Sequence, residues 1–248
     1  MIKLERGKRP KELTQEVCDE LTKLYLENRD KDVWNCSKVK QPLKDALLDM
    51  THGKCAYCEC QLRIESKDVT IDHFLPKSDY PHMVLKWENL LPSCLRCNRD
   101  KSDYSEKIVN PCIDNPQEYL ALNKKDRYRL QGIDKGGVGK NTIISIKLND
   151  IVRVMVPRME EWEGIHQSLE WIWEDLKENG YKIKYKNRIE VLLQNCKREN
   201  TYAAVKASNM LDDDCYLQIR QYMQNEDKWT DRLQELEDEL REIALQFI

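Results

Sequence analysis

The sequence predicts an α+β fold that is mainly helical. Apolar residues recur every three to four positions over much of the chain, which is the pattern of amphipathic helices. A short central stretch instead combines β-branched residues with two C-x-x-C pairs, which indicates a small strand region supported by a metal. With 248 residues the chain can bury a core of its own, so this metal is a local support.

Four segments follow from these patterns. Leucines at three- and four-residue spacing predict two helices before the first cysteine pair, and the glycine of His52-Gly53 suits a helix C-terminus. The predicted segments are an N-terminal helical region at 1–54, a core with a zinc site at 55–110, a connecting helix and hairpin at 111–149, and a C-terminal helical region at 150–248.

The core is expected to run strand, loop, strand and helix around a metal. Arg63-Ile64 and residues 69–71 are typical of two short strands, or of one strand and its approach, with Asp72-His73 at the end of the second. A proline-punctuated loop at 74–86 then leads to a partner strand at 87–91, which would contain Asn89. The residues from Asn98 onward have helical composition.

The connecting segment contains a glycine loop that requires a specific check. Residues 115–120 are typical of a capped helix start, and residues 127–133 and 142–148 of two strands of a hairpin. The loop between these strands, Lys-Gly-Gly-Val-Gly-Lys at 135–140, has the shape of a deviant Walker phosphate loop. Such a loop requires a helix directly after it, whereas the β-branched run here indicates a strand. We therefore expect a mobile hairpin tip.

The C-terminal region carries two apolar stripes. One stripe ends at Asn179-Gly180, and the other forms about three heptads in the last helix, which favour a helical core slightly over a partner-binding seam. His166 beside the first stripe is expected to be structural. The stripes are Trp162, Ile165, Leu169, Ile172, Trp173 and Leu176, and then Trp229, Leu233, Leu236, Leu240, Ile243 and Phe247.

The net charge of −3 lacks the basic excess that is typical of nucleic-acid-binding domains. The charge is uneven, however, because residues 3–11 and 177–198 are rich in lysine and arginine and residues 235–242 are acidic. We expect the basic stretches to contact phosphates and the acidic one to meet a protein. The alternative is that all three are solvated helix faces.

The chain is expected to be a cytoplasmic protein with no membrane partner. No stretch approaches the roughly 18 unbroken apolar residues of a membrane span, and the N-terminus lacks a secretory apolar run. The sequence contains 10 cysteines, of which two pairs have metal-ligand spacing and the rest are scattered. Without an export signal this distribution favours zinc plus free thiols over disulfides.

Two cysteine pairs predict the structural metal. Cys55 with Cys58, and Cys94 with Cys97, each place two thiolates where a short turn can direct both at one tetrahedral Zn²⁺. Cys60 leaves open which thiols are the ligands. The alternative to a nuclease core at this stage is an inert zinc module.

The residues around this zinc site suit phosphodiester cleavage, which requires a base, a cation and a donor for the leaving oxygen. His73 can be the base. Asp72 and Asn98 offer hard oxygen ligands, which suit Mg²⁺ or Mn²⁺ better than Zn²⁺. Asn89 can hold the His73 ring or the loop, and Lys101, one helical turn after Asn98, can reach a phosphate.

The pattern C-x-x-C, Asp72-His73, Asn89, C-x-x-C-Asn98 and Lys101 resembles the HNH (ββα-metal, His-Me finger) endonucleases that carry paired zinc knuckles. The resemblance implies a ββα-metal core with His73 as general base, and with Asp72 and Asn98 as ligands of the catalytic ion. It also implies Asn89 as the middle residue that orients the base. Asparagine at position 98, where the family often has histidine, makes the site H-N-N and argues against soft metals.

Outside the core the chain is similar to the PtuB-like nucleases of retron and Septu anti-phage systems, in residues 2–13, 53–59, 114–119 and 141–153. This likeness implies a PtuA-like ATPase partner, a retron reverse transcriptase with its RNA-DNA hybrid, and a toxic nuclease held in check until infection. We expect a metal-dependent endonuclease that acts on DNA in preference to RNA. The competing interpretation is a non-catalytic, zinc-stabilised nucleic-acid-binding or adaptor protein.

Overall fold

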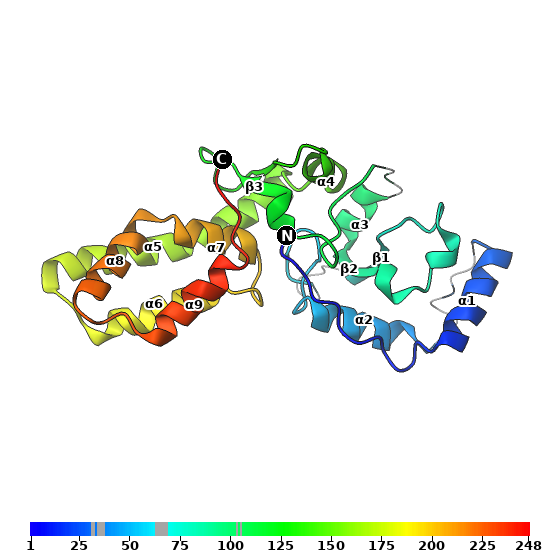
Figure 1. Ribbon diagram of the computed structural model, residues 1–248, viewed down its shortest axis with the longest axis horizontal. Coiled ribbons are helices and arrows are strands. Elements are labelled where there is room, and N and C mark those ends of the chain that lie inside the picture. Colours follow the sequence, from blue (N-terminus) through cyan, green and yellow to red (C-terminus); the bar gives the residue numbers. More distant parts are fainter. Residues whose placement is uncertain (31–32, 34–37, 63–68, 103, 105) are drawn as a thin grey trace.

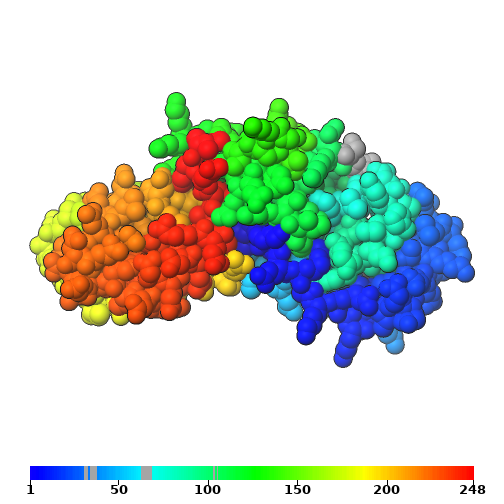
Figure 2. Space-filling view, in the orientation of Figure 1, coloured from blue at the N-terminus to red at the C-terminus, as the bar shows by residue number. Residues whose placement is uncertain are grey.

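A computed structural model describes residues 1–30, 33, 38–62, 69–102, 104 and 106–248. The molecule is elongated, with a helical lobe at one end and a mixed part with two short strands at the other (Figure 1). The segment around β3 and α4 lies between them, close to both chain ends. Figure 2 shows that this segment and the first residues of the chain join the two parts, with a hollow on one edge between them. No helix of the described residues is long and apolar enough to span a bilayer.

The N-terminal region forms the two predicted helices, α1 (Gln15–Glu27) and α2 (Lys40–Met50). Thr14 caps α1 by accepting a hydrogen bond from the backbone N–H of Val17 at 3.3 Å. Their apolar faces share one buried cluster with the loop after β1, and this cluster includes Leu21, Leu43, Leu47, Leu85 and Trp87. The N-terminal helices thus support the central strands from one side.

The core has the predicted strand, loop, strand and helix order. β1 (Val69–His73) pairs antiparallel with β2 (Leu90–Cys94), with His73 opposite Leu90 and Asp72 opposite Leu91. α3 (Leu95–Lys101) follows β2 directly, and the connecting loop contains the 3₁₀ turns η1 (Pro81–Met83) and η2 (Trp87–Asn89). The second strand therefore begins later than predicted, and Asn89 ends a 3₁₀ turn. The strand expected at Arg63-Ile64 lies outside the described residues.

The connecting segment differs from the prediction. Its elements are η3 (Pro116–Glu118), β3 (Leu120–Leu122), β4 (Leu130–Gly132) and α4 (Val138–Ile146). β4 pairs with β3, so the predicted partner strand at 142–148 is wrong, because that stretch is largely helical. Thr142 and Ile146 are buried on α4, and this packing overrides the β-propensity of their segment.

Two local contacts explain the helix. The Asp134 carboxylate accepts hydrogen bonds from the backbone N–H groups of Val138 at 2.9 Å and Gly139 at 2.7 Å, which caps α4. Gly139 packs so closely that a Cβ there would lie 2.0 Å from the Tyr119 carbonyl oxygen. The glycine loop is therefore a capped turn rather than a mobile tip, and our argument that no helix follows it was wrong. The N–H groups of Val138 and Gly139, which a phosphate loop would use to bind phosphate, instead donate to Asp134, so the loop does not function as a phosphate loop in this structure.

The C-terminal region is helical as predicted, and its buried apolar side chains belong to one cluster with those of the cysteine turn and the connecting segment. Its elements are the π-helix η4 (Ile151–Met155), α5 (Val156–Asn179), α6 (Ile183–Asn195), α7 (Ala203–Leu211), α8 (Asp214–Asn225) and α9 (Asp231–Arg241). The heptad leucines Leu233, Leu236 and Leu240 are fully buried where α9 meets α6 and α7, so the heptads form core. His166 bonds Asp213 at 2.7 Å and is structural, as expected.

The charged stretches of this lobe pair with each other. Lys197 lies 2.8 Å from Glu239, and Arg198 lies 3.6 Å from Glu242, so basic residues meet the acidic C-terminal stretch. Lys184 is bound by Asp175 at 2.8 Å. The expectation that the second basic stretch contacts phosphates and the acidic one contacts a protein is thus not supported for these residues, whose charges are used within the fold.

Candidate metal centre and active site

The four cysteines of the paired C-x-x-C motifs converge on one point. Their sulfur atoms all lie within 4.8 Å of one another, and the Sγ atoms of Cys58 and Cys94 are 4.0 Å apart. Four thiolates at the usual Zn–S distance of about 2.3 Å would have sulfurs slightly under 4 Å apart. The donor set therefore fits a structural Zn²⁺ held by Cys55, Cys58, Cys94 and Cys97.

Cys60 contributes to this centre through its backbone. Its carbonyl accepts a hydrogen bond from the Cys55 N–H at 2.9 Å, which closes the first cysteine turn, and its sulfur is not part of the converging set. Two groups donate hydrogen bonds to the sulfurs. The Cys97 N–H lies 3.4 Å from Cys94 Sγ, and the Arg153 guanidinium lies 3.4 Å from Cys97 Sγ. Hydrogen-bond donors stabilise thiolates, and the positive charge of Arg153 adds to this effect.

Asp72 is held on both carboxylate oxygens. The buried Tyr57 hydroxyl donates to Oδ2, and the Lys101 ammonium lies 3.2 Å from Oδ1. Burial, followed by the Asp72 charge, raises the pKa of Tyr57 well above its ordinary value, so the phenol stays protonated and donates. Tyr57 stands between two zinc ligands in the sequence, so the cysteine turn also positions Asp72.

Lys101 differs from the expected arrangement. Its side chain is only 2% exposed, and its ammonium bonds the His73 carbonyl at 2.7 Å as well as Asp72. A group in this position cannot extend to a phosphate in solvent, so the structure does not place Lys101 where we expected. It instead neutralises Asp72 and ties α3 to the end of β1.

His73 is half-buried, and its ring is fixed by the loop. Nε2 lies 3.0 Å from the Val84 carbonyl oxygen, and since a carbonyl can only accept, Nε2 carries the proton of the neutral ring. This leaves Nδ1 as the acceptor nitrogen. Burial lowers the pKa of His73 below its ordinary value of 6.5, which favours the neutral form.

Asn89 holds the loop and does not bond the His73 ring directly. Its Oδ1 accepts from the Leu75 N–H at 2.7 Å, and its Nδ2 donates to the Leu75 carbonyl at 3.1 Å and the Met83 carbonyl at 3.3 Å. These bonds fix the segment that carries the Val84 carbonyl. Asn89 was expected to hold either the His73 ring or the loop, and in the structure it holds the loop.

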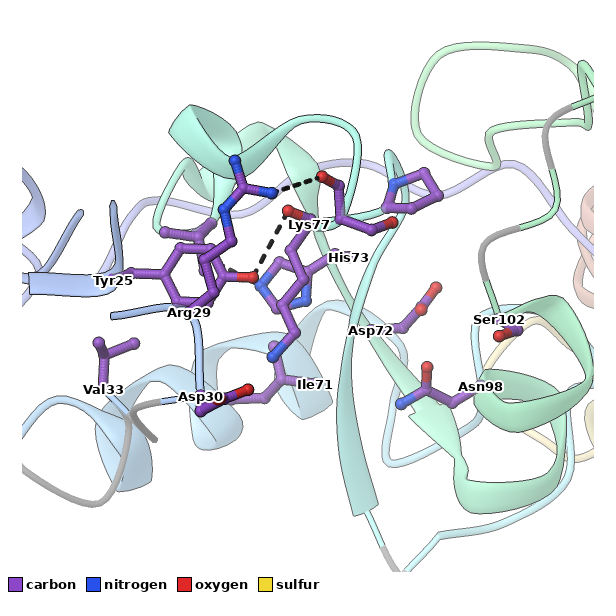
Figure 3. Close-up of a pocket in the computed structure, with 13 residues that line it drawn as sticks. Tyr25, Arg29, Asp30, Val33, Ile71, Asp72, His73, Lys77, Asn98 and Ser102 are labelled. Carbon is purple, nitrogen blue, oxygen red and sulfur yellow. Dashed lines mark hydrogen bonds between the residues drawn. The ribbon is translucent and has the colours of Figure 1, made fainter. Parts of the chain in front are cut away.

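Asp72, His73 and Asn98 line one cavity of about 600 Å³ (Figure 3). The His73 ring lies on one side of β1, and Asp72 and Asn98 lie on the other, as strand alternation requires. Asp72 and Asn98 supply oxygen donors from adjacent elements, a set that fits a hard divalent cation with remaining positions for water and phosphate.

Sequence reasoning missed Tyr57 and the far wall of this cavity. That wall comes from the end of α1 and the residues after it, with Tyr25, Arg29 and Asp30. Tyr57 could have been noticed because it lies between two predicted ligands. No sequence signal links α1 to the active site, because only the tertiary fold brings residues 25–30 next to Asp72 and His73.

Comparison with known proteins agrees with this geometry. Residues 55–104 match the family model of the HNH endonucleases. The chain is 34% identical to the Septu protein PtuB of Bacillus thuringiensis over 234 residues. This alignment covers 90% of this chain and 87% of that protein. It is 29% identical over 161 residues to the Septu protein PtuB of Bacillus mycoides (strain KBAB4), covering 48% and 54% of the two chains. It is also 30% identical over 112 residues to protein ea31 of Escherichia phage lambda, covering 42% and 36%.

The ββα unit, the four-cysteine cluster and the family match together define an HNH endonuclease. The extent of the match to the Bacillus thuringiensis protein assigns it more narrowly. The chain belongs to the Septu PtuB family.

Proposed function

We propose that the protein hydrolyses phosphodiester bonds of nucleic acid, with DNA as the favoured substrate, using Mg²⁺ or Mn²⁺ at Asp72 and Asn98. The observation that carries this proposal is that Asp72, His73 and Asn98 line a single cavity beside the cysteine cluster. The divalent ion would supply Lewis-acid stabilisation of the charge that develops on the phosphate oxygens.

The side chains have distinct parts in this reaction. Nδ1 of the neutral His73 ring accepts a proton from the attacking water, while Nε2 keeps its hydrogen bond to Val84. Asn89 acts as a positioning residue through the loop. Tyr57 and Lys101 fix the Asp72 carboxylate and offset its charge.

Replacement of the base tests the proposal. His73→Ala is expected to reduce cleavage by about 10²- to 10⁴-fold, the usual contribution of a general base. Zinc content and the circular dichroism spectrum should be unchanged, because the thiolate cluster does not include His73. His82→Ala is a matched control, since this exposed histidine on η1 lies outside the cavity lining. Cleavage is measured on labelled DNA and RNA with Mg²⁺ and with Mn²⁺.

Full activity in His73→Ala would contradict the catalytic assignment. Binding of nucleic acid without cleavage by the wild-type protein, alone and with its copurified partners, would favour the alternative of a zinc-stabilised adaptor. Loss of zinc in a cysteine variant is expected under both interpretations and does not separate them.

We further propose a role in anti-phage defence with a PtuA-like ATPase, and a retron reverse transcriptase with its RNA-DNA hybrid as an additional partner. The support is membership of the Septu PtuB family together with the resemblance found in the sequence. Copurification from the native operon tests both partners. We also place the protein in the cytoplasm, because free cysteines, including several buried ones, favour a reducing compartment.

A further inference from the structure

The active-site cavity has a second wall that the catalytic assignment leaves without a role. Tyr25, Arg29 and Asp30 reach it from the end of α1 and the residues after it, and Lys77 and Ser78 reach it from the loop after β1 (Figure 3). This wall faces the same space as Asp72, His73 and Asn98. A substrate strand that presents its scissile phosphate to His73 must therefore pass along it.

Two cations on this wall are held in place. One guanidinium nitrogen of Arg29 donates to the Ser78 carbonyl at 3.2 Å, and the Tyr25 hydroxyl donates to the Lys77 carbonyl at 3.5 Å. The Lys77 ammonium lies 5.4 Å from the centroid of the Tyr25 ring. These contacts tie the end of α1 to the loop after β1, so both cations are positioned before a ligand arrives.

The charge on this wall is available to a ligand. In the part of the chain that the structure describes, neither Arg29 nor Lys77 forms an ion pair, and the contact to Ser78 uses one of the five N–H donors of Arg29. On the opposite wall, Asp72 is already neutralised by Lys101 at 3.2 Å. The carboxylate of Asp30 is the remaining counter-charge among the lining residues.

The chemistry of this wall favours a phosphate over a base. A base would need an open aromatic face, whereas Tyr25 is 3% exposed and carries the Lys77 ammonium over its ring. The planar guanidinium of Arg29 matches the geometry of two phosphate oxygens, and Lys77 adds a second point charge.

We propose that Arg29 and Lys77 contact backbone phosphates of the strand that is cut and so form a phosphate-binding subsite on this wall of the cavity. This inference rests on the proposed nuclease function and adds the N-terminal helical region to the active site. Arg29, which follows the end of α1, lies outside residues 55–104 that match the HNH family model.

Binding of a short fluorescein-labelled DNA duplex, followed by anisotropy in the full-length His73→Ala background, tests the subsite without cleavage. Arg29→Ala is expected to weaken binding about 10-fold, the effect of one good charge-assisted contact. The slope of log K against log salt should become shallower by about 0.9 for each phosphate contact removed, and therefore most in the Arg29→Ala, Lys77→Ala double variant. Arg29→Lys should retain the salt slope and lose part of the affinity, because it keeps the charge without the planar fork.

Lys23→Ala is the matched control, because Lys23 is exposed on α1, the helix that ends two residues before Arg29, and does not line the cavity. In the catalytic protein, Arg29→Ala should raise KM with little change in kcat, as expected for binding that is uniform between substrate and transition state. The subsite proposal would be wrong if Arg29→Ala and Lys77→Ala bound DNA with the same affinity and the same salt slope as Lys23→Ala. Wild-type cleavage with that result would leave the proposed function intact, whereas absence of wild-type cleavage together with weakened binding in Arg29→Ala would support the subsite and contradict the function.

Discussion

The two metal sites on the ββα unit are prepared in different ways. The zinc site consists of four buried sulfurs that converge within 4.8 Å and need no further ligand. The proposed catalytic site consists of one carboxylate and one amide, and Tyr57 and Lys101 already bond the carboxylate. A closed, four-coordinate site retains its ion, whereas two oxygen ligands leave most positions of a hard cation to water and substrate.

The difference between the two sites indicates how a small strand pair can support catalysis. β1 and β2 have five residues each and would be marginal as an isolated hairpin. The thiolate cluster joins the end of β2 and the start of α3 to the Cys55 turn, and α1 and α2 pack on the other side. In the proposed arrangement, a zinc ion held by four thiolates would stabilise the strands and the helix that carry the ligands of the more weakly bound catalytic ion.

The largest effect is expected from opening the closed site. Cys94→Ser should abolish zinc retention and cleavage, because structural zinc supplies folding free energy on the order of 10 kcal/mol. Hydrogen exchange should lose the most protection in β1, β2 and α3, which contain or adjoin Cys94 and Cys97, and less in α5 to α9, which belong to the same continuous apolar core but contain none of the four cysteines. Metal content is measured by mass spectrometry.

Cys60→Ser is the matched control for that experiment. Cys60 is 8% exposed and next to the cluster, but its sulfur lies outside the converging set. The variant should keep one zinc per chain. Loss of zinc in Cys60→Ser with retention in Cys94→Ser would show that the ligand set is different.

The second prediction separates the two sites by how readily each releases its metal ion to a chelator. A brief treatment with EDTA should stop cleavage completely, and added Mg²⁺ or Mn²⁺ should restore it, because two protein oxygens bind the ion weakly. Zinc content should stay constant, since the four sulfurs enclose their ion. Two results would contradict the assignment of a structural ion to one site and a catalytic ion to the other. One is recovery of cleavage with Zn²⁺ alone, and the other is loss of zinc in parallel with loss of cleavage.

The sequence predicted the convergence of the four cysteines and the order of the core because both depend on local chemistry. Two C-x-x-C pairs specify a tetrahedral thiolate set, and Asp72-His73 at a strand end places their side chains on opposite sides. The helical C-terminal region followed equally from its apolar periodicity.

The errors arose where tertiary contacts decide. Residues 142–148 have β-branched composition, yet the Asp134 cap and the close approach of Gly139 to Tyr119 give a helix. Lys101 was expected to reach a phosphate, and its ammonium instead bonds the buried carboxylate of Asp72. The wall with Arg29 depends on how α1 packs, which no motif encodes.

The smallest of the predicted effects concerns the link between the two sites. Tyr57 is fully buried between two zinc ligands, and its hydroxyl donates to the Asp72 carboxylate, so it transmits the position of the closed site to the open one. Tyr57→Phe removes this hydroxyl and keeps the ring. We expect the affinity for Mn²⁺ to fall by about 10- to 100-fold, the usual cost of losing a partner of a metal ligand.

Direct titration of Mn²⁺ by electron paramagnetic resonance measures this affinity apart from cleavage, and zinc content should stay at the wild-type value. Tyr128→Phe is a suitable control, because its hydroxyl bonds Glu163 on α5 at 2.7 Å, and neither residue lines the cavity or belongs to the cysteine cluster. An unchanged Mn²⁺ affinity in Tyr57→Phe would mean that Lys101 alone fixes Asp72. The zinc cluster would then support the strands without setting the geometry of the catalytic carboxylate.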